Sequence, residues 1–340
     1  MIKEAIHELI ESKDLTYDNT KEVMDEIMSG KATDAQIASF ITALSIKGET
    51  IEEITACAEI MREKGIKLDK KGLEVFEIVG TGGDQVGTFN ISTTAAFVIA
   101  GAGVPVAKHG NRSVSSMSGA ADVLETLGAN LALTPEQNEK VLEKCHICFM
   151  FAPTYHSSMK YAAPARRETG IRSVFNILGP LTNPAAAEYQ LMGVYNDKLV
   201  EPLAQVLKNL GVKRGAAVCG ASRLDELTVT GSNRVCEIKD GKLSTYTLNA
   251  EDFGMKKVPL EEILGGSPED NAQITNDVLS GVKDSKRDIV VLNAGMSLYL
   301  AGKADTIDDG IKLAQETIDS GKAKTKLDEF IKATNEFAKA

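Results

Sequence analysis

The first 66 residues repeat apolar side chains at the spacing of a helix. An apolar residue returns every three or four positions, which places these side chains on one helical face. The segments that share this pattern are residues 5–10, 23–28, 37–44 and 54–61. No strand pattern lies between them, so they predict a small all-helical module.

The pattern changes from residue 73 onward. Short apolar runs typical of buried strands occupy residues 75–79, 104–107, 148–151, 190–194 and 216–218. Helical periodicity separates them, at residues 91–102, 120–127, 135 onward and 199–210. This alternation predicts an α/β fold with a mostly parallel central sheet. An antiparallel section is expected over residues 226–248, followed by a helix capped at Ser267 and two final helices.

Residues 154–184 interrupt this alternation with helical, proline-punctuated sequence. We therefore expect the chain to cross back to the helical module before it re-enters the sheet. The predicted organisation is a helical domain of residues 1–70, completed by roughly residues 154–184. The α/β domain then comprises residues 71–153 and 185–340.

The composition indicates a globular protein. Apolar residues make up 43% of the 340 residues and charged residues 25%, a balance typical of that class. The formal net charge is −10 without a Lys/Arg-rich run, which argues against a nucleic-acid-binding protein. No apolar stretch is long enough for a membrane span, and the first residues lack the apolar core of a signal peptide.

The five cysteines lie in apolar segments, at positions 57, 145, 148, 219 and 236. They are expected to be reduced core thiols of a cytoplasmic protein. Cys145 and Cys148 have the spacing of a redox pair or of half a zinc site. Because no second Cys/His pair at a suitable spacing accompanies them, we interpret them as structural.

A glycine-rich segment follows the first predicted strand. Gly80-Thr81-Gly82-Gly83-Asp84 leads to Thr88-Phe89-Asn90-Ile91-Ser92-Thr93, where a helix begins. Glycines let the main chain approach a ligand closely, and a helix start offers unpaired N–H groups. This combination predicts a phosphate or pyrophosphate site. The alternative is a plain tight turn in which Asn90 or Ser92 caps the helix.

A second polar segment, Lys108 to Ser116, also follows a predicted strand and precedes a helix. Ligands of open parallel sheets bind outside the carboxyl ends of the strands, so both segments would face one crevice. Lys108 and Arg112 supply cations and the serines supply hydroxyl donors for phosphate oxygens. The alternative is a solvated loop.

Asp225 and Glu226 are adjacent carboxylates shortly after the strand at residues 216–218. Hard oxygen ligands beside a pyrophosphate site suggest Mg²⁺. Surface acid pairs are common, however, so the spacing alone favours an ordinary exposed pair.

Arg166 and Arg167 form an arginine pair within the segment Ala163 to Gly170. Either guanidinium has the geometry to hold a carboxylate through two hydrogen bonds, and either is equally compatible with a plain helix surface.

These motifs together resemble the anthranilate phosphoribosyltransferase family. The shared motifs, in the same order, are Gly80 to Asp84, Asn90 to Thr93, Lys108 to Arg112, Ser118 to Glu125, Asn176 to Leu181 and Leu224 to Glu226. The resemblance covers nearly the whole chain. It implies a small helical domain and a larger α/β domain of the nucleoside phosphorylase and phosphoribosyltransferase type, with the active site between them. It also implies a cytoplasmic homodimer formed through the helical domains.

The resemblance further implies which residues meet each ligand. Phosphoribosyl pyrophosphate would be held by Gly80, Gly83, Asp84, Thr88, Asn90, Ile91, Ser92, Thr93, Lys108, His109, Gly110, Asn111, Arg112, Ser113, Val114, Ser115, Ser116 and Ala120. Anthranilate would meet Gly80, His109, Asn111 and Arg166, with Arg166 facing its carboxylate. Two Mg²⁺ ions would be bound by Ser92, Asp225 and Glu226.

The chain departs from the family pattern at three positions. Gln85 and Arg223 stand where glycine is frequent, and Ala120 stands where serine is frequent. None of these departures removes an implied metal ligand or the arginine that faces anthranilate. We expect altered affinity and a retained activity.

The reaction that the resemblance implies joins anthranilate to phosphoribosyl pyrophosphate in tryptophan biosynthesis. No catalytic acid or base is expected, because an aromatic amine is already neutral at pH 7. The alternatives are a pyrimidine nucleoside phosphorylase of the same architecture, a non-catalytic nucleic-acid-binding relative, and a transferase for another aromatic amine. The Lys108 to Arg112 segment differs from that of the phosphorylases, and the charge of −10 argues against nucleic acid.

Overall fold

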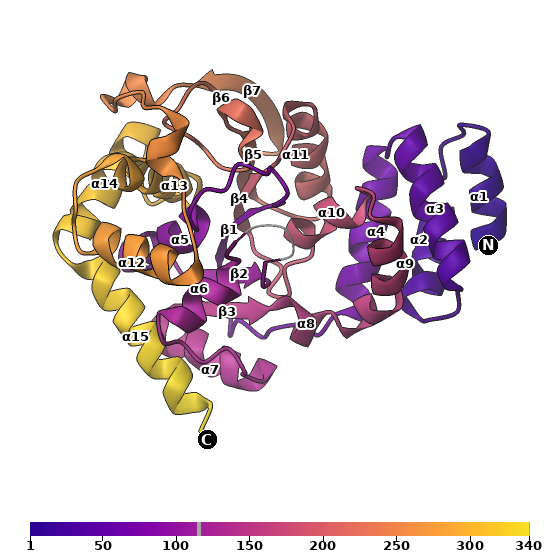
Figure 1. The fold of residues 1–340 in the computed structure, drawn as a ribbon, viewed down its shortest axis with the longest axis horizontal. Coiled ribbons are helices and arrows are strands. Elements are labelled where there is room, and N and C mark those ends of the chain that lie inside the picture. The colour runs from indigo at the N-terminus through magenta and orange to yellow at the C-terminus, as the bar shows by residue number, and fades with distance from the viewer. Residues whose placement is uncertain (114–116, 340) are drawn as a thin grey trace.

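The protein consists of a helical part and a larger α/β part, joined by a narrow waist (Figure 1). A computed structural model describes residues 1–113 and 117–339. The N-terminus lies at the far end of the helical part, and the C-terminal helix lies on the opposite side of the sheet (Figure 1). Within the described ranges, every helix is too short or too polar to cross a membrane.

The helical part begins with the predicted helices, α1 (Ile2–Ile10), α2 (Tyr17–Met28), α3 (Asp34–Lys47) and α4 (Ile51–Lys64). Thr33 and Thr50 start the last two by accepting a hydrogen bond from the main chain three residues on, in capping boxes with Gln36 and Glu53. The prediction of an all-helical module is confirmed.

A later segment returns to these helices. It contains α8 (Ala152–Tyr155), η1 (Ser157–Tyr161), α9 (Ala163–Thr169), α10 (Phe175–Leu178) and η2 (Gly179–Leu181). α9 packs on α3, η1 on α2 and α10 on α4, and their apolar side chains share one core with the first helices. The exact residue boundaries of the two domains stay a prediction.

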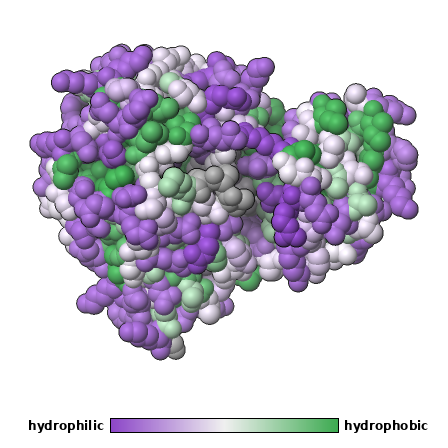
Figure 2. All heavy atoms as spheres, in the orientation of Figure 1, coloured by the Kyte–Doolittle hydropathy of each residue, from purple (hydrophilic) through white to green (hydrophobic). Residues whose placement is uncertain are grey.

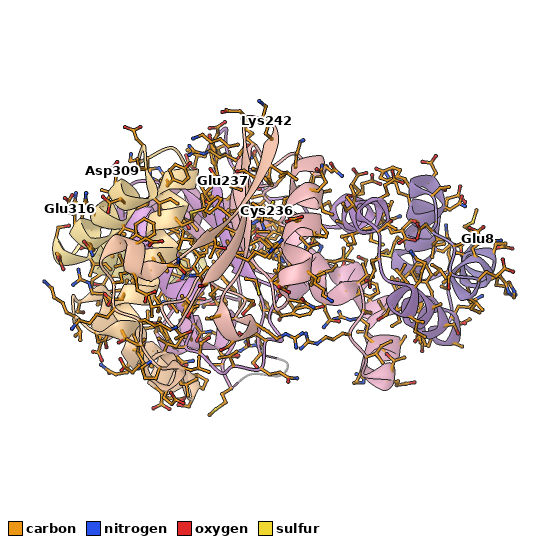
Figure 3. The ribbon with its side chains drawn as sticks, turned by 90° about the horizontal axis from the view of Figure 1, so that it is seen from above. Glu8, Cys236, Glu237, Lys242, Asp309 and Glu316 are labelled. Carbon is orange, nitrogen blue, oxygen red and sulfur yellow. The ribbon has the colours of Figure 1, made fainter. Side chains whose placement is uncertain are left out.

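A seven-stranded sheet forms the centre of the α/β part, in the order β3-β2-β1-β4-β5-β6-β7. The strands are β1 (Phe76–Gly80), β2 (Val106–Gly110), β3 (Ile147–Phe151), β4 (Tyr189–Gly193), β5 (Arg214–Cys219), β6 (Asn233–Lys239) and β7 (Lys242–Leu248). β1 to β5 are parallel, and β6 and β7 form an antiparallel hairpin at one edge. Figure 3 labels Cys236 and Glu237 on β6 and Lys242 at the turn of this hairpin. The predicted mostly parallel α/β fold is confirmed.

Helices cover both faces of the sheet. They are α5 (Ile91–Gly101), α6 (Ala120–Thr126), α7 (Pro135–Cys145), η3 (Asp197–Leu199), α11 (Val200–Asn209), η4 (Ala221–Arg223), η5 (Ala250–Phe253), η6 (Leu260–Ile263), α12 (Pro268–Leu279), α13 (Ser285–Leu300), α14 (Ile307–Asp319) and α15 (Lys322–Phe337). α5 is apolar all round, because it lies between β1 and β2 on one side and α13, α14 and α15 on the other. α11 packs on β5 and β6 and also touches α4 of the helical part.

Three details differ from the predictions. β2 continues to Gly110, so Lys108 and His109 belong to the strand, where they pair with Phe149 and Met150. The antiparallel section begins at Asn233, because the residues before it belong to the loop that joins β5 to β6 and carries Asp225 and Glu226. Three described helices follow α12 where two were predicted, since only Ser320 and Gly321 separate α14 from α15.

Candidate active site

Two glycines at neighbouring strand ends make room for Asp225. Gly80 ends β1 and Gly193 ends β4, and the two lie in register. A β-carbon on Gly80 would lie 2.2 Å from Asp225 Oδ2, and one on Gly193 would lie 1.7 Å from the Asp225 carbonyl oxygen. The strand order reverses between β1 and β4, which is where open α/β sheets bind ligands. Figure 2 shows the surface hollowed between the helical and α/β parts.

The glycine segment after β1 folds over this position. Thr81 N–H donates to the Gly193 carbonyl at 2.9 Å, and Gly82 N–H donates to Asp225 Oδ2 at 2.6 Å. On its outer side, the Arg172 guanidinium donates to the Gly83 carbonyl and stacks 4.2 Å from the Tyr195 ring centre. The segment is therefore tied to β4, to Asp225 and to the chain that leads back from α9.

A cluster of carboxyl groups lies beside this segment. Asp84 and Glu226 lie close enough to Asp225 for their negative charges to act on its carboxyl group. Burial raises the pKa of Asp225 well above its usual range, with the charges of Asp84 and Glu226 adding to the effect. Burial also raises the pKa of Glu226 to about 7, against the lowering effect of Lys108. Adjacent carboxylates that resist ionisation in this way are suited to share a cation.

The start of α5 faces the same carboxylates. Glu226 Oε1 accepts the Ser92 N–H at 3.2 Å, so a carboxylate occupies the helix terminus that the sequence predicts to bind phosphate. The Ser92 hydroxyl accepts a hydrogen bond from Lys108 Nζ at 3.3 Å. The structure thus brings together Ser92, Asp225 and Glu226, the three implied metal ligands.

Asn90 stands at the N-cap position of α5 but uses its side chain for other contacts. Its side chain makes no cap hydrogen bond. Instead its amide donates to the Ser118 carbonyl at 3.2 Å, and its oxygen accepts from Ser118 Oγ at 3.2 Å and Asn271 Nδ2 at 3.0 Å. Asn90 therefore links α5 to the segment before α6 and to α12.

Lys108 is a buried cation with only 4% of its surface exposed. Its ammonium group donates to the Ile78 carbonyl at 2.6 Å and to Ser92. Burial lowers the pKa of Lys108, while Glu226, Glu77 and Asp225 act in the opposite direction. A cation in this position faces the carboxylates and the glycine segment from inside the sheet.

His109 is buried next to Lys108. Its N–H donates to Glu77 Oε1 at 2.8 Å, and its ring Nδ1 lies 3.3 Å from the Gly179 carbonyl. The other ring nitrogen, Nε2, is buried without a hydrogen-bond partner among the described residues. Burial lowers the pKa of His109 to about 3, so the ring is neutral at physiological pH.

The rest of the second segment turns outward. The exposed Arg112 guanidinium pairs with Asp122 and Glu125, and Asn111 Oδ1 accepts the Arg112 N–H at 2.8 Å. Asp122 Oδ2 accepts the N–H groups of Ser113 and Gly119, each at 2.9 Å. The predicted contacts at Val114, Ser115 and Ser116 lie outside the described residues.

The remaining predicted positions surround this core of the site. Thr88 bridges to Leu264, Ile91 and Thr93 are buried in α5, and Ala120 lies near Gly110 at the start of α6. Arg166 sits on α9 with its guanidinium 5.2 Å from the Phe175 ring centre. It forms no ion pair with any carboxylate in the described part of the chain, so its charge is available to a ligand. Arg167, its neighbour, is exposed.

Cys145 and Cys148 are buried, unlinked thiols of the hydrophobic core. Burial raises the pKa of both.

Three residues of the site are absent from the sequence predictions. Glu77 is a fully buried carboxylate in β1, Gly193 accommodates Asp225, and Arg172 contacts the glycine segment. Of the three, only Glu77 could have been recognised from the sequence, because a charged residue inside an apolar strand needs buried partners. The other two depend on which strands and loops become neighbours.

Comparison with known proteins agrees with this two-part construction. Residues 73–324 match the α/β domain of a glycosyl transferase family, and residues 3–65 match the helical bundle domain of the same family. These matches define the class as a transferase built from a helical bundle and an α/β domain.

Individual relatives show which members of this transferase class the chain resembles. The chain is 56% identical to anthranilate phosphoribosyltransferase of Endomicrobium trichonymphae, over 99% of this chain and 100% of that protein. It is 54% identical to anthranilate phosphoribosyltransferase of Methanobrevibacter smithii, over 98% and 100%. A crystal structure of the Thermus thermophilus anthranilate phosphoribosyltransferase superposes with a TM-score of 0.92 at 40% identity, covering 97% of this chain and 99% of that one. The Saccharomyces cerevisiae enzyme in complex with phosphoribosyl pyrophosphate and Mg gives 0.90 at 28% identity, covering 98% of each chain.

The chain belongs to the anthranilate phosphoribosyltransferases of this glycosyl transferase family.

Proposed function

We propose that this protein transfers the phosphoribosyl group of phosphoribosyl pyrophosphate to the amino group of anthranilate. The products are N-(5-phosphoribosyl)anthranilate and pyrophosphate, and the step belongs to tryptophan biosynthesis. The observation that carries the proposal is the position of Asp225. Its carboxyl lies over the end of β1 at Gly80, and its main chain lies over the end of β4 at Gly193, beside the glycine segment proposed to hold the diphosphate.

The reaction forms one carbon–nitrogen bond and breaks one carbon–oxygen bond. The neutral amine attacks the ribose C1 carbon as pyrophosphate departs, and the attacking nitrogen then loses a proton to solvent. Holding both substrates in line and stabilising the departing negative charge are the two tasks of the chain. Lys108 is suited to the second task, because it is a buried cation beside the glycine segment.

The donor set fits Mg²⁺. Magnesium in proteins is usually held by one or two carboxylates, with substrate phosphates and water completing the octahedron. Asp225, Glu226 and the Ser92 hydroxyl supply such a set, and Asp84 lies next to it. Two ions per subunit would neutralise both the carboxylate cluster and the diphosphate. Mg²⁺ supplies charge stabilisation to the leaving pyrophosphate when it is bound.

Anthranilate has its proposed site at Gly80, His109, Asn111 and Arg166. Arg166 is the proposed partner of the anthranilate carboxylate, because burial lowers the pKa of its guanidinium and no described carboxylate neutralises it. A related structure, the yeast enzyme with 4-fluoroanthranilate, has a TM-score of 0.90 with this chain at 26% identity. That likeness supports an aromatic acid as the second substrate.

We also propose a cytoplasmic homodimer joined through the helical parts. α1 and α3 pack together and expose large apolar side chains, with Ile10 68% and Ile46 82% exposed. Exposed apolar groups of this size favour an interface. Light scattering on Ile46→Glu should show a monomer, whereas the matched change Val282→Glu in the α/β part should leave a dimer. A monomeric parent protein contradicts the proposal.

The activity is tested by following anthranilate fluorescence in the presence of phosphoribosyl pyrophosphate. Fluorescence should fall with Mg²⁺ and stay constant when the metal is chelated. Turnover of thymidine with phosphate and no turnover of anthranilate would instead indicate a nucleoside phosphorylase. A salt-dependent DNA shift without catalysis would indicate a nucleic-acid-binding relative. Faster turnover of another aromatic amine would change the substrate and keep the chemistry.

A further inference from the structure

The sheet opens between β1 and β2, the strands that lead to the two ligand-binding segments. β1 pairs with β4 over five positions, and β2 pairs with β3 over five. Between β1 and β2 only one pair, Phe76 with Val106, is formed. Beyond that pair the two strands form no further ladder pairs.

Side chains replace the hydrogen bonds that this opening removes. A parallel ladder continued in this register would join the His109 N–H to the Ile78 carbonyl, and the Ala107 carbonyl to the Ile78 N–H. Instead the His109 N–H donates to Glu77 Oε1 at 2.8 Å, and the Ile78 carbonyl accepts from Lys108 Nζ at 2.6 Å. The Ala107 carbonyl accepts from Asn183 Nδ2 at 2.8 Å. Glu77, Lys108 and Asn183 therefore stand in place of the ladder.

Glu77 is at the centre of this arrangement, and its geometry requires two accepting oxygens. It is fully buried, and its second oxygen accepts from Asn183 Nδ2. Asn183 cannot turn its own oxygen toward Glu77, because that oxygen already accepts the Ala185 N–H at 2.8 Å. Both partners of Glu77 are thus fixed donors. Burial raises the pKa of Glu77 to about 7, and the charge of the neighbouring Lys108 opposes this rise.

The same hydrogen-bond network holds the residues beside the proposed anthranilate site. Asn183 ends the segment that begins at Gly179, and the Gly179 carbonyl is the partner of the His109 ring. The Pro180 carbonyl accepts from Gln190 Nε2 of β4 at 2.7 Å. A single carboxylate therefore connects β1, the main chain at His109 and residues 179–183.

We propose that Glu77 is a positioning residue of the transferase. It holds His109 and residues 179–183 in place relative to the glycine segment, so that anthranilate fits between them. The inference rests on the proposed function, because it assigns Glu77 to the anthranilate side of that site. Glu77 itself touches neither substrate. Its effect reaches them through the His109 main chain and through Asn183.

Glu77→Gln tests the proposal with little change in side-chain size. Glutamine offers one accepting oxygen, so its NH₂ group must face either the His109 N–H or the Asn183 NH₂, both of which are donors. We expect KM for anthranilate to rise roughly 10-fold or more, since a buried donor is left unpaired. KM for phosphoribosyl pyrophosphate should change by less than about 3-fold, because the glycine segment keeps its bonds to Asp225 and Gly193. Glu77→Asp keeps both accepting oxygens and should lie between Glu77→Gln and the parent protein.

Glu237→Gln is the matched control. Glu237 is a buried carboxylate of the same sheet, 6% exposed, and lies on β6, where it faces Tyr299 of α13. It accepts hydrogen bonds from the hydroxyls of Tyr299 at 2.9 Å and Tyr246 at 3.0 Å. Hydroxyl groups rotate to serve as donor or acceptor, so glutamine is accommodated there. This variant should alter thermal stability without altering either KM.

The kinetic results distinguish a failure of the role of Glu77 from a failure of the proposed function. An active parent protein whose Glu77→Gln variant keeps the parent KM for anthranilate, or shifts both KM values equally, overturns the role of Glu77. An inactive parent protein overturns the proposed function instead. If Glu77→Gln does not fold, Asn183→Ala removes the other end of the same hydrogen bond and should raise KM for anthranilate in the same selective way. An unchanged KM in a folded Asn183→Ala variant also overturns the proposal.

Discussion

The carbonyl oxygen of Asp225 lies where a side chain at Gly193 would begin. A β-carbon on Gly193 would stand 1.7 Å from that oxygen and 2.3 Å from its carbon. Both clashing atoms belong to the main chain, so no side-chain rotation relieves the contact. The position of Asp225 therefore depends on the absence of a side chain on a strand that is 32 residues earlier in the chain.

Gly193→Ala should displace Asp225 from the ends of β1 and β4. We expect turnover to fall roughly 100-fold or more, because a misplaced charge-stabilising group costs that much. The Mg²⁺ concentration for half-maximal rate should rise as well. Met192→Leu, a volume-conserving change at the adjacent position, is the control and should keep its rate. A Gly193→Ala enzyme with parent kinetics would show that Asp225 has no fixed role.

Asp225→Asn combined with Glu226→Gln should abolish magnesium-supported turnover while the fold persists. The substitutions remove the two negative charges and keep the side-chain shapes. Since burial raises the pKa of both carboxyls, the neutral pair should not reduce thermal stability. Steady-state rates across a Mg²⁺ titration, together with a thermal melt, measure both effects. Near-normal rates would refute the metal assignment.

Arg172→Ala should weaken binding of phosphoribosyl pyrophosphate. The guanidinium connects the Gly83 carbonyl to the Tyr195 ring, and the Arg172 carbonyl accepts from Ser45 Oγ of α3 at 3.0 Å. Without this connection the glycine segment loses an anchor to the helical part, and KM for phosphoribosyl pyrophosphate should rise roughly 5- to 10-fold. Arg167→Ala, which removes an exposed arginine of α9, is the matched control. Equal effects of the two changes would mean that only general charge matters.

Arg223→Gly should leave stability unchanged or raise it by up to about 1 kcal/mol. Arg223 has a φ of +67°, a value that costs energy for any residue with a β-carbon. Glycine removes this strain and adds some freedom to the unfolded chain, so the two effects partly cancel. Gln85, the other position where the family often has glycine, has a φ of +62° and should behave alike. Urea unfolding measures the change, and a loss above about 1 kcal/mol would show that the arginine side chain stabilises the turn.

His109 should make stability depend on pH in one direction. Burial lowers its pKa from 6.5 to about 3 in the folded protein, with His156 and Lys108 adding to this and the Gly179 carbonyl opposing it. Below pH 6.5 the unfolded chain binds a proton that the folded chain does not. This contribution to stability is complete above pH 6.5 and falls by up to about 1.4 kcal/mol per pH unit toward pH 3.

The comparison that isolates this effect uses His109→Asn. The difference in unfolding free energy between the parent and this variant should shrink as the pH falls below 6.5. A difference that stays constant would mean that folding does not shift the pKa of His109.

The local elements of the fold were predictable because each rests on neighbouring residues. The first helices follow from apolar spacing, and the strands of the parallel sheet follow from short apolar runs bounded by glycine. The glycine segment and the Asp225-Glu226 pair are likewise visible as continuous motifs. The close spacing of α14 and α15 hid one helix, because two residues between helices give no clear break.

The relationships across the sheet were not predictable in the same way. Gly193 becomes important only when β4 is known to lie beside β1, and Asn90 is used as a bridge to Ser118 and Asn271 instead of a cap. Arg172 depends on a loop folding back from the helical part. Each of these contacts joins positions far apart in sequence, so no periodicity records it.

The hydrogen bond from the Ser92 N–H to the Glu226 carboxylate affects which ligands can bind at the start of α5. A lone phosphate group approaching the start of α5 meets an anion that already holds the helix terminus. Divalent cations reverse this repulsion, since they bind the carboxylate and the incoming oxygens together. We therefore expect phosphate to bind this helix terminus weakly without a divalent cation, and a diphosphate to bind together with its counterions.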